Sequence, residues 1–354
     1  MILEALENFL IFATAFAIAG FVVACVARSA GCRCPDRVSP RALGRVYALA
    51  LAVPPLGAAW LVAAALLPCW WLGESEVSAT HPAPLHNLHL VGDLTARLEP
   101  LLGATVVVIV AGFAVLVAWS TARGHRRLAW AVSRLGLTDT QPPALHLALV
   151  RDAARRHGLD VGLLHSDYPF SFVWGFRRSK LVLSSGLLAA LSPSELTGVL
   201  EHEAAHHARR DNLVKLGLLI AAHASLAAPL ARRVLRWRND QVELLCDEIA
   251  AARGSTPLDI AEALVKLRRR AVMLGRGPAV AAASRFVAGD DRSLERRVRR
   301  LLTLAHVASA AASAPRSGVT LVVAAMFLGS LAALAAWAPL AVHAATESFL
   351  QTLR

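Results

Sequence analysis

The chain has 354 residues, and its 37 Lys or Arg outnumber its 25 Asp or Glu, which gives a formal net charge of +12. Hydrophobic residues make up 56% of the sequence, which is more than a water-soluble domain usually contains. The five cysteines are scattered, so the sequence shows neither a disulfide framework nor a C-x-x-C metal site.

Four long apolar segments without charged residues predict membrane-spanning helices. Each is long enough to cross a hydrocarbon core of about 30 Å. They run from Phe9 to Ala27, Val46 to Leu72, Leu101 to Ser120, and Gly318 to Ala345. We therefore expect three transmembrane helices with short loops in residues 1–120, a soluble segment over 121–316, and a fourth span with a short outer tail in 317–354.

The charges of the loops predict the orientation in the membrane. Residues 28–45 are rich in Arg and residues 73–100 are rich in acid, so the positive-inside rule places the first loop and segment 121–316 in the cytoplasm. The expected location is the plasma membrane, with the lipid bilayer as a partner. Because topology and anionic lipid account for the excess of Arg, we expect no direct nucleic acid binding.

The start of segment 121–316 predicts a helix and a small sheet. Helical periodicity covers 144–157, and short strands are expected over 159–165, 170–174 and 180–183, with a turn at Gly175. An edge strand can bind an extended substrate backbone by adding a strand. The candidate residues are Phe170, Ser171, Phe172, Val173 and Trp174. The alternative is a hairpin that only covers the helices.

The sequence V-L-E-H-E-A-A-H-H contains the pattern H-E-x-x-H at His202, Glu203 and His206. Upstream, Ser192 and Glu195 form a capping box that starts a helix here. Residues four apart lie on the same helical face, so the two imidazoles can bind one metal ion. Glu203 can take a proton from an attacking water, which is the arrangement of a zinc metalloprotease.

A catalytic zinc needs a third protein ligand, usually a His or a carboxylate. Downstream, Glu243 and Asp247 lie four apart on one predicted helical face. Glu243 can bind the metal, while Asp247 can accept a hydrogen bond from a ligand imidazole and fix its tautomer. The alternative, a solvated acidic helix edge, is less consistent with the nearby H-E-x-x-H.

The apolar run 213–235 lies between the two halves of the expected site. A single crossing of the bilayer would put His202 and Glu243 on opposite sides of the membrane and exclude a shared zinc. We therefore expect this run to be buried, to lie along the membrane, or to enter and return, with a break near Pro229.

Two separated blocks resemble one known family. H-E-A-A-H-H-A-R-R-D-N-L followed by E-L-L-C-D is similar to the integral-membrane zinc peptidases typified by the beta-lactam-sensing antirepressor proteases. The resemblance implies a mainly α membrane protein in which a cytoplasmic α+β gluzincin-like zinc protease domain lies between the third and fourth transmembrane helices. It also implies a Zn²⁺ cofactor and a protein substrate such as a transcriptional repressor.

Only about ten residues follow the fourth predicted span, so we expect no penicillin-binding domain and no covalent sensing of beta-lactams. Two further hypotheses stay open beside regulated cleavage of a repressor. One is a quality-control or processing protease resembling the heat-shock and prenyl-protein membrane proteases. The other is a non-catalytic membrane scaffold that keeps a structural zinc.

Overall fold

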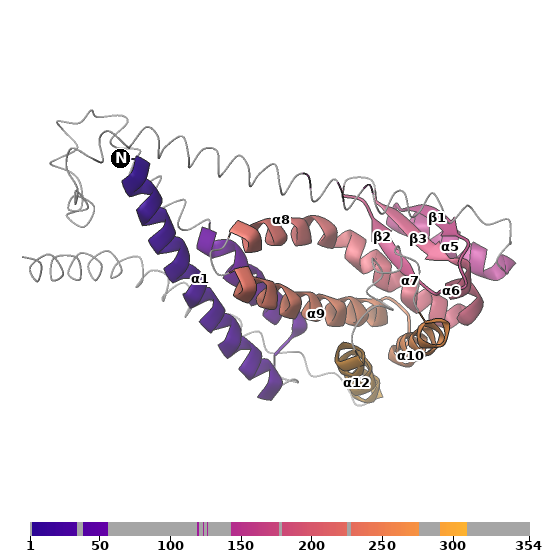
Figure 1. The fold of residues 1–354 in the computed structure, drawn as a ribbon. Coiled ribbons are helices and arrows are strands. Elements are labelled where there is room, and N and C mark those ends of the chain that lie inside the picture. The colour runs from indigo at the N-terminus through magenta and orange to yellow at the C-terminus, as the bar shows by residue number, and fades with distance from the viewer. Residues whose placement is uncertain are drawn as a thin grey trace, which may run out of the picture. The chain divides into compact units, whose positions relative to one another are not determined.

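A computed structural model describes residues 2–33, 38–55, 119, 123, 126, 143–176, 179–224, 228–275 and 291–309. Contacts divide the chain into two compact units. The helical unit comprises Met1–Ala118, Leu218–Arg238 and Pro315–Arg354, and the mixed unit comprises Trp119–Gly217 and Asn239–Ala314. Figure 1 shows the helices and strands of both units.

The prediction of a mainly α membrane protein with four transmembrane helices is wrong. None of the helices that the structure describes combines the length and the apolar character needed to cross a membrane. The first predicted span falls within α1 (Ile2–Arg33), whose Ala24 and Ala27 are buried within the protein. One side of α1 therefore packs within the protein, while Ile18, Val22 and Val26 of the same helix are exposed. Residues 56–72, 101–118 and 318–345 lie outside the described part of the chain.

The helical unit packs α1 against a helix over 40–55 and against parts of two later helices. At Gly20, a Cβ atom would come within 2.7 Å of the carbonyl oxygen of Ala50, so the close helix approach requires glycine. The ring of Trp237 lies 6.1 Å from that of Phe21 and 6.0 Å from that of Tyr47. The guanidinium of Arg28 lies 4.6 Å from the Trp237 ring centroid, a cation–π contact.

The mixed unit contains a three-stranded sheet in the order β1-β3-β2. Strand β1 (Asp160–Leu164) runs parallel to β3 (Lys180–Ser184), and β2 (Ser171–Trp174) runs antiparallel to β3. The three strands and the turn at Gly175, where φ is 106°, confirm the sequence prediction. Helix α5 (Ala144–His157) has the predicted bounds and ends at Gly158 in the left-handed conformation.

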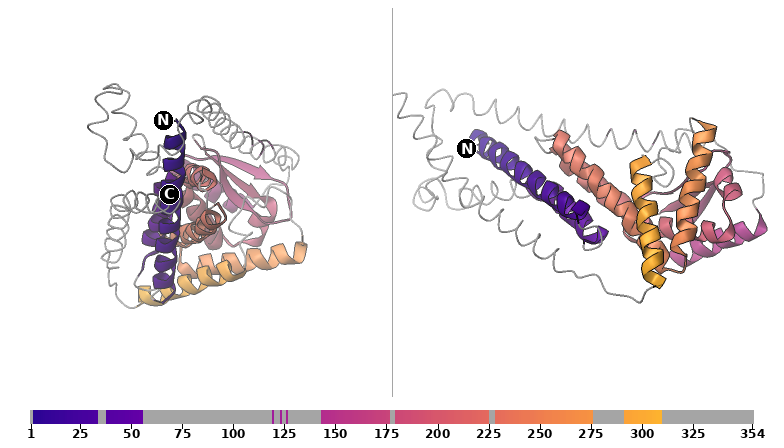
Figure 2. Two further views of the ribbon diagram at one scale, coloured as in Figure 1. Left: turned by 60° about the vertical axis from the view of Figure 1, so that its left-hand side comes forward. Right: turned by 90° about the horizontal axis from the view of Figure 1, so that it is seen from below.

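Four more helices belong to the mixed unit. They are α6 (Ser185–Ala190), α7 (Pro193–Ala208), α10 (Pro257–Leu274) and α12 (Asp291–Ser309). Helix α10 packs against both α7 and α12 (Figure 2). The buried side chains of this core are almost all aliphatic, among them Leu187, Leu196, Leu264 and Leu301.

Glu201 fixes the position of α7 from one side. Its side chain is 2% exposed, and its carboxylate lies 2.8 Å from Nη1 of Arg156 and 3.1 Å from Nε2 of His157. Arg253 approaches the same carboxylate at 3.8 Å. A buried carboxylate is tolerated only when cations or donors compensate it, so these contacts tie α7 to α5 and to the turn that follows α9 (Ala228–Ala252).

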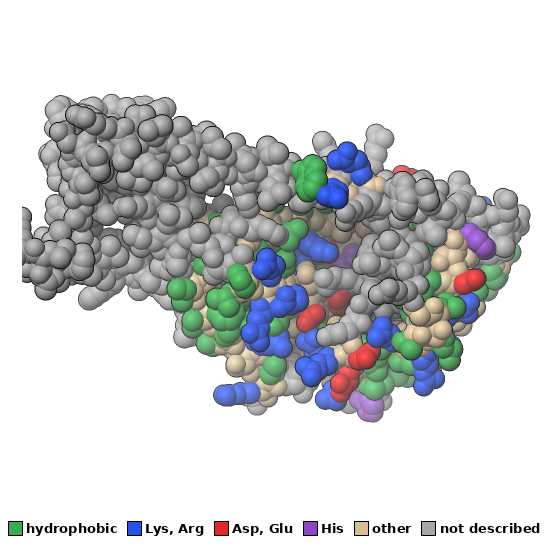
Figure 3. Space-filling model, in the orientation of Figure 1, with side chains coloured by type: hydrophobic (Ala, Val, Ile, Leu, Met, Phe, Trp, Pro, Cys, Tyr) green, Lys and Arg blue, Asp and Glu red, His purple; other side chains and the backbone are tan. Residues whose placement is uncertain are grey.

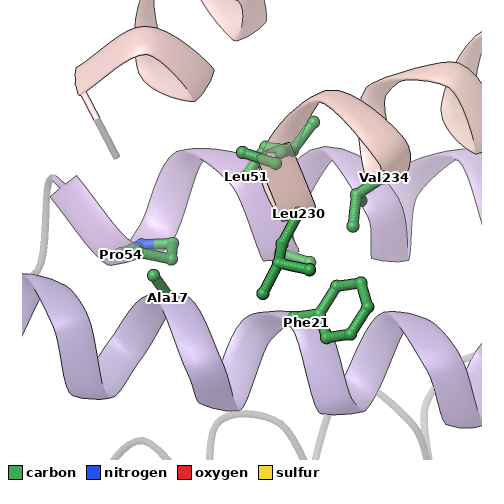
Figure 4. Close-up of a pocket in the computed structure, with 8 residues that line it drawn as sticks. Ala17, Phe21, Leu51, Pro54, Leu230 and Val234 are labelled. Atoms are coloured by element: carbon green, nitrogen blue, oxygen red, sulfur yellow. The ribbon is translucent and has the colours of Figure 1, made fainter. Parts of the chain in front are cut away.

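The run 213–235 is divided between two helices, as expected from Pro229. Helix α8 (Asp211–Ala224) ends before this proline, and α9 (Ala228–Ala252) begins one residue ahead of it. On the face shown in Figure 3, basic side chains of the described residues lie with a few acidic ones among them. In the helical unit, a small apolar pocket lies between α1, the helix over 40–55 and α9 (Figure 4), and its lining includes Phe21, Leu51, Leu230 and Val234.

Candidate metal centre

Helix α7 presents the two histidines of the H-E-x-x-H pattern. The helix starts with the predicted capping box, in which Ser192 accepts a hydrogen bond from the Glu195 N–H and Glu195 accepts one from the Ser192 N–H. Pro193 occupies its first turn. His202 is 1% exposed, and its Nε2 lies 3.2 Å from Nε2 of His206. The helical spacing therefore brings two metal-binding nitrogens together, as the sequence predicted.

Helix α9 brings Glu243 to the same point. Its Oε2 lies 3.5 Å from His202 Nε2, and its Oε1 lies 3.8 Å from His206 Nε2. One ligand atom from each of the three residues lies within 4.8 Å of the others. Ligand atoms about 2.0–2.1 Å from a tetrahedral zinc are about 3.3–3.4 Å apart, so the donor set fits this ion.

Two further observations support this fit. Within the part of the chain that the structure describes, the buried Oε2 atom of Glu243 accepts no hydrogen bond. Burial alone would raise the Glu243 pKa, but the two imidazoles and Arg297 lower it well below its usual range. The residue is therefore ionised at neutral pH, as a metal ligand must be.

Each histidine contacts a carboxylate through its other ring nitrogen. His202 Nδ1 lies 2.9 Å from Asp247 Oδ1, and His206 Nδ1 lies 2.9 Å from Asp211 Oδ2. Such carboxylates fix the ring orientation and leave Nε2 facing the metal. The sequence predicted this role for Asp247 and missed it for Asp211. The signal for Asp211 was its place just after the end of α7, five residues beyond His206.

Arg297 is a site residue that the sequence analysis missed. Its Nε and Nη2 donate hydrogen bonds of 2.7 Å to the two carboxylate oxygens of Asp247. Its Nη1 lies 3.5 Å from Glu243 Oε2, although the side chain is only 4% exposed. Burial alone would raise the Asp247 pKa, but this guanidinium lowers it below its usual range. The same carboxylates raise the Arg297 pKa further, so both groups stay charged at neutral pH.

The described residues contain a second group of possible metal ligands, in which Cys246 lies beside His206. This group comprises His206, Asp211 and Cys246, and the thiol sulfur lies 3.5 Å from His206 Nδ1. Burial raises the Cys246 pKa, so the thiol is neutral at pH 7 and a weak ligand. Burial alone would lower the His206 pKa, but the carboxylates of Asp211 and Glu243 raise it well above its usual range. A proton on His206 competes with a metal there.

Glu203 lies next to the candidate metal ligand His202 in the sequence and is 4% exposed. The Ser171 hydroxyl of β2 donates a hydrogen bond of 2.7 Å to its Oε1. This contact links the H-E-x-x-H helix to the strand predicted to bind substrate. His207, five residues from His202, is not part of either group of possible metal ligands. The roles of Glu203 and of the three ligands stay predictions that the geometry permits.

The predicted substrate strand lies at an edge of the sheet. Among the described strands, β2 pairs only with β3. Phe170 and Phe172 are buried in a small cluster with Leu164 and Val182, so these two phenylalanines anchor the strand. Val173 and Trp174 are partly exposed. Of the five predicted substrate residues, the structure brings Ser171 to Glu203.

Comparison with known proteins covers this part of the chain. Residues 144–270 match the family model described as Peptidase family M48. A "Protease HtpX homolog" from Thermococcus kodakarensis is 35% identical over 109 residues, which are 29% of this chain and 36% of the relative. Proteins of the same name from Pelotomaculum thermopropionicum and Methanocaldococcus jannaschii are 34% and 32% identical over 106 residues, 28% of this chain and 36% of each relative.

The chain thus spans about a third of the length of the curated relatives it matches. The finer likeness to the beta-lactam-sensing antirepressor proteases stays a prediction, because these matches concern proteases of another name. The segment that holds His202, Glu203 and His206 on one helix and Glu243 on another matches the zinc metallopeptidases of family M48.

Proposed function

We propose that this chain is a zinc-dependent endopeptidase that hydrolyses peptide bonds of protein substrates. The observation that carries the proposal is the convergence of His202, His206 and Glu243 beside Glu203. The match of residues 144–270 to an M48 peptidase model supports it independently of the geometry.

Each residue of the site has its own role in the proposed hydrolysis. His202, His206 and Glu243 would hold the zinc, which when bound polarises a carbonyl and makes water more acidic. Glu203 is placed to take a proton from the attacking water and to pass it to the leaving amine. The hydrogen bond from Ser171 orients the Glu203 carboxylate. Asp247 and Asp211 hold the imidazoles, and Arg297 holds Asp247.

Strand β2 would hold the substrate in extended form. Its position at the sheet edge and the contact of Ser171 with Glu203 support this role. A peptide that adds a strand there gains main-chain hydrogen bonds whatever its sequence. The scissile bond would then lie near Ser171, where the strand meets the H-E-x-x-H helix.

The nature of the substrate admits two versions of this proposal. The first is regulated cleavage of a repressor, suggested by the resemblance of the two sequence blocks. The second is quality control or processing of many proteins, which the relatives named "Protease HtpX homolog" favour. Cells carrying the wild type or Glu203→Gln separate them, because the first version predicts accumulation of one protein in the variant and the second predicts accumulation of many.

Zinc content and cleavage of unfolded casein test the proposed activity. Wild type should contain one zinc and cut casein, a chelator should abolish cleavage, and added zinc should restore it. Glu203→Gln should retain the zinc and cut at a rate lower by about 10²–10⁴-fold, the usual contribution of a general base. Glu262→Gln, at an exposed position of α10, is the matched control and should behave as wild type. Equal rates for wild type and Glu203→Gln, or a wild type with zinc but no cleavage, would reject the enzyme in favour of a scaffold.

A further inference from the structure

Strand β2 presents alternate main-chain groups to β3 and to its other side. In an antiparallel pair, every second residue bonds to the partner strand and the residues between point away from it. The carbonyl of Phe170 accepts a hydrogen bond from the Ser184 N–H, which fixes the alternation. The carbonyl of Val173 therefore points to the side on which an added strand would pair, and the carbonyl of Gly175, just beyond the strand, shares a hydrogen-bond donor with it.

The side-chain amide of Asn212 donates hydrogen bonds to both of these carbonyls. Its Nδ2 donates a hydrogen bond of 2.8 Å to the carbonyl oxygen of Val173 and one of 3.3 Å to that of Gly175. The residue lies in the first turn of α8, directly after Asp211, which contacts His206. The turn that positions Asn212 therefore also positions Asp211 beside His206, a candidate metal ligand.

The occupied carbonyls lie at one end of the strand. Ser171 contacts Glu203 at the other end, and Val173 and Gly175 follow it by two and four residues, or about 7 and 13 Å along a strand. A substrate strand that starts beside Ser171 can donate to β2 only until it reaches Val173, where the Asn212 amide already donates. Further pairing would require this amide to leave.

We propose that Asn212 is a specificity-determining residue that limits how many residues of an extended substrate pair with β2. The inference rests on the proposed peptidase function and on substrate binding along this strand. Asn212 thus sets the end of the part of β2 that can pair with substrate, about two residues from the scissile bond. Peptides extended beyond this boundary gain no main-chain hydrogen bonds from β2.

The alternative role for Asn212 is to tether α8 to the sheet without touching substrate. Both roles predict some loss of stability in variants at this position. Only the proposed role predicts that the variants change how the Michaelis constant depends on peptide length, so this dependence is the discriminating measurement.

Nested peptides test the inference with the full chain loaded with zinc. A casein-derived peptide that the protein cuts once is shortened residue by residue from either end, and KM and kcat are measured for each length. For wild type, KM should stop falling once the peptide extends about two residues from the scissile bond on the side that lies along β2. In Asn212→Ala, two further residues should lower KM by about five-fold, the effect of one or two regained hydrogen bonds.

Two more variants sharpen the test. Asn212→Asp lacks the donor and its carboxylate repels the carbonyls, so it should show the same length dependence as Asn212→Ala. Leu213→Ala, at the next and half-exposed position of α8, should keep the plateau of wild type. Zinc content and thermal unfolding check that each variant is folded.

The outcomes separate this inference from the proposed function. Cleavage by wild type without a plateau on either side, or a plateau that persists in both Asn212 variants, overturns the inference and leaves the peptidase standing. A wild type that contains zinc and cuts none of the peptides overturns the proposed function and the inference with it.

Discussion

Among the described residues, the helical unit buries fewer polar and charged side chains than the mixed unit. The core of the helical unit is built of aliphatic and aromatic residues such as Leu51, Tyr47 and Trp237. The mixed unit adds to its aliphatic core a set of buried acidic and basic side chains that includes Glu201, Glu243, Asp247 and Arg297. Burying a charge costs several kcal/mol unless a partner compensates it. The mixed unit therefore carries a desolvation cost that an apolar core would avoid. This cost is concentrated at the candidate metal centre.

The comparison predicts the largest effect for loss of a buried charge. Arg297→Gln leaves Asp247 without its cation and should lower the free energy of unfolding by about 3–5 kcal/mol and the zinc affinity by about 10–100-fold. Arg300→Gln is the control, because Arg300 also binds an acid of α9, Glu248, but is 24% exposed. It should cost about 1 kcal/mol or less. Denaturant unfolding and chelator competition measure both, and equal losses in the two variants would refute the role of burial.

A truncation in the apolar core should separate stability from metal binding. Trp237→Ala removes the ring that contacts Phe21, Tyr47 and Arg28 and should cost about 3 kcal/mol in unfolding free energy. The zinc affinity should change by less than about two-fold, since no ligand lies in the helical unit. Trp119→Ala, at a side chain that is 48% exposed, serves as the control with little effect. A large loss of zinc affinity in Trp237→Ala would contradict the division of roles.

A buried carboxylate remote from the metal centre should give a pH-dependent effect. Burial alone would raise the Glu195 pKa, but the Lys266 ammonium and the Ser192 N–H lower it below its usual value. A lowered folded-state pKa adds stability that is fully present above about pH 4.3 and is lost as pH falls through the folded value. Glu195→Gln should thus cost about 1 kcal/mol at pH 7 and less below about pH 4. Unfolding curves at both pH values check this, and a pH-independent loss would exclude the charge as the cause.

The smallest effect is expected at the turn between α7 and α8. Arg210 has a φ of 52°, a left-handed conformation that glycine adopts without strain. Because Arg210 is exposed, Arg210→Gly should raise the unfolding free energy by up to about 1 kcal/mol. Thermal unfolding measures the gain. Destabilisation would show that the Arg210 side chain makes contacts worth more than the strain.

Local signals explain what could be predicted from the sequence. The capping residues Ser192 and Glu195 start α7, and the four-residue spacing then places His202 and His206 on one face. The same spacing pointed to Glu243 and Asp247 together. Short strand-like runs and the turn at Gly175 identified the strands of the small sheet.

Two contacts of the candidate site escaped prediction. Arg297 comes from a helix fifty residues after Asp247 and stands near Arg296, Arg299 and Arg300, so nothing local singles it out. The contact of Asp211 with His206 follows the positive φ of Arg210, which no residue type signalled. The prediction of membrane-spanning helices was wrong for the described residues, because apolar content does not reveal that one side of α1 packs on other helices.

Helix α7 is held from two directions at neighbouring residues, with cations bound to Glu201 and carboxylates bound to His202 and His206. Inserting or deleting one residue upstream rotates everything beyond it by about 100°. Such an indel would at once strip Glu201 of its cations and aim the histidines away from Glu243. The rotational register of this helix against the surrounding core is therefore locked by these contacts.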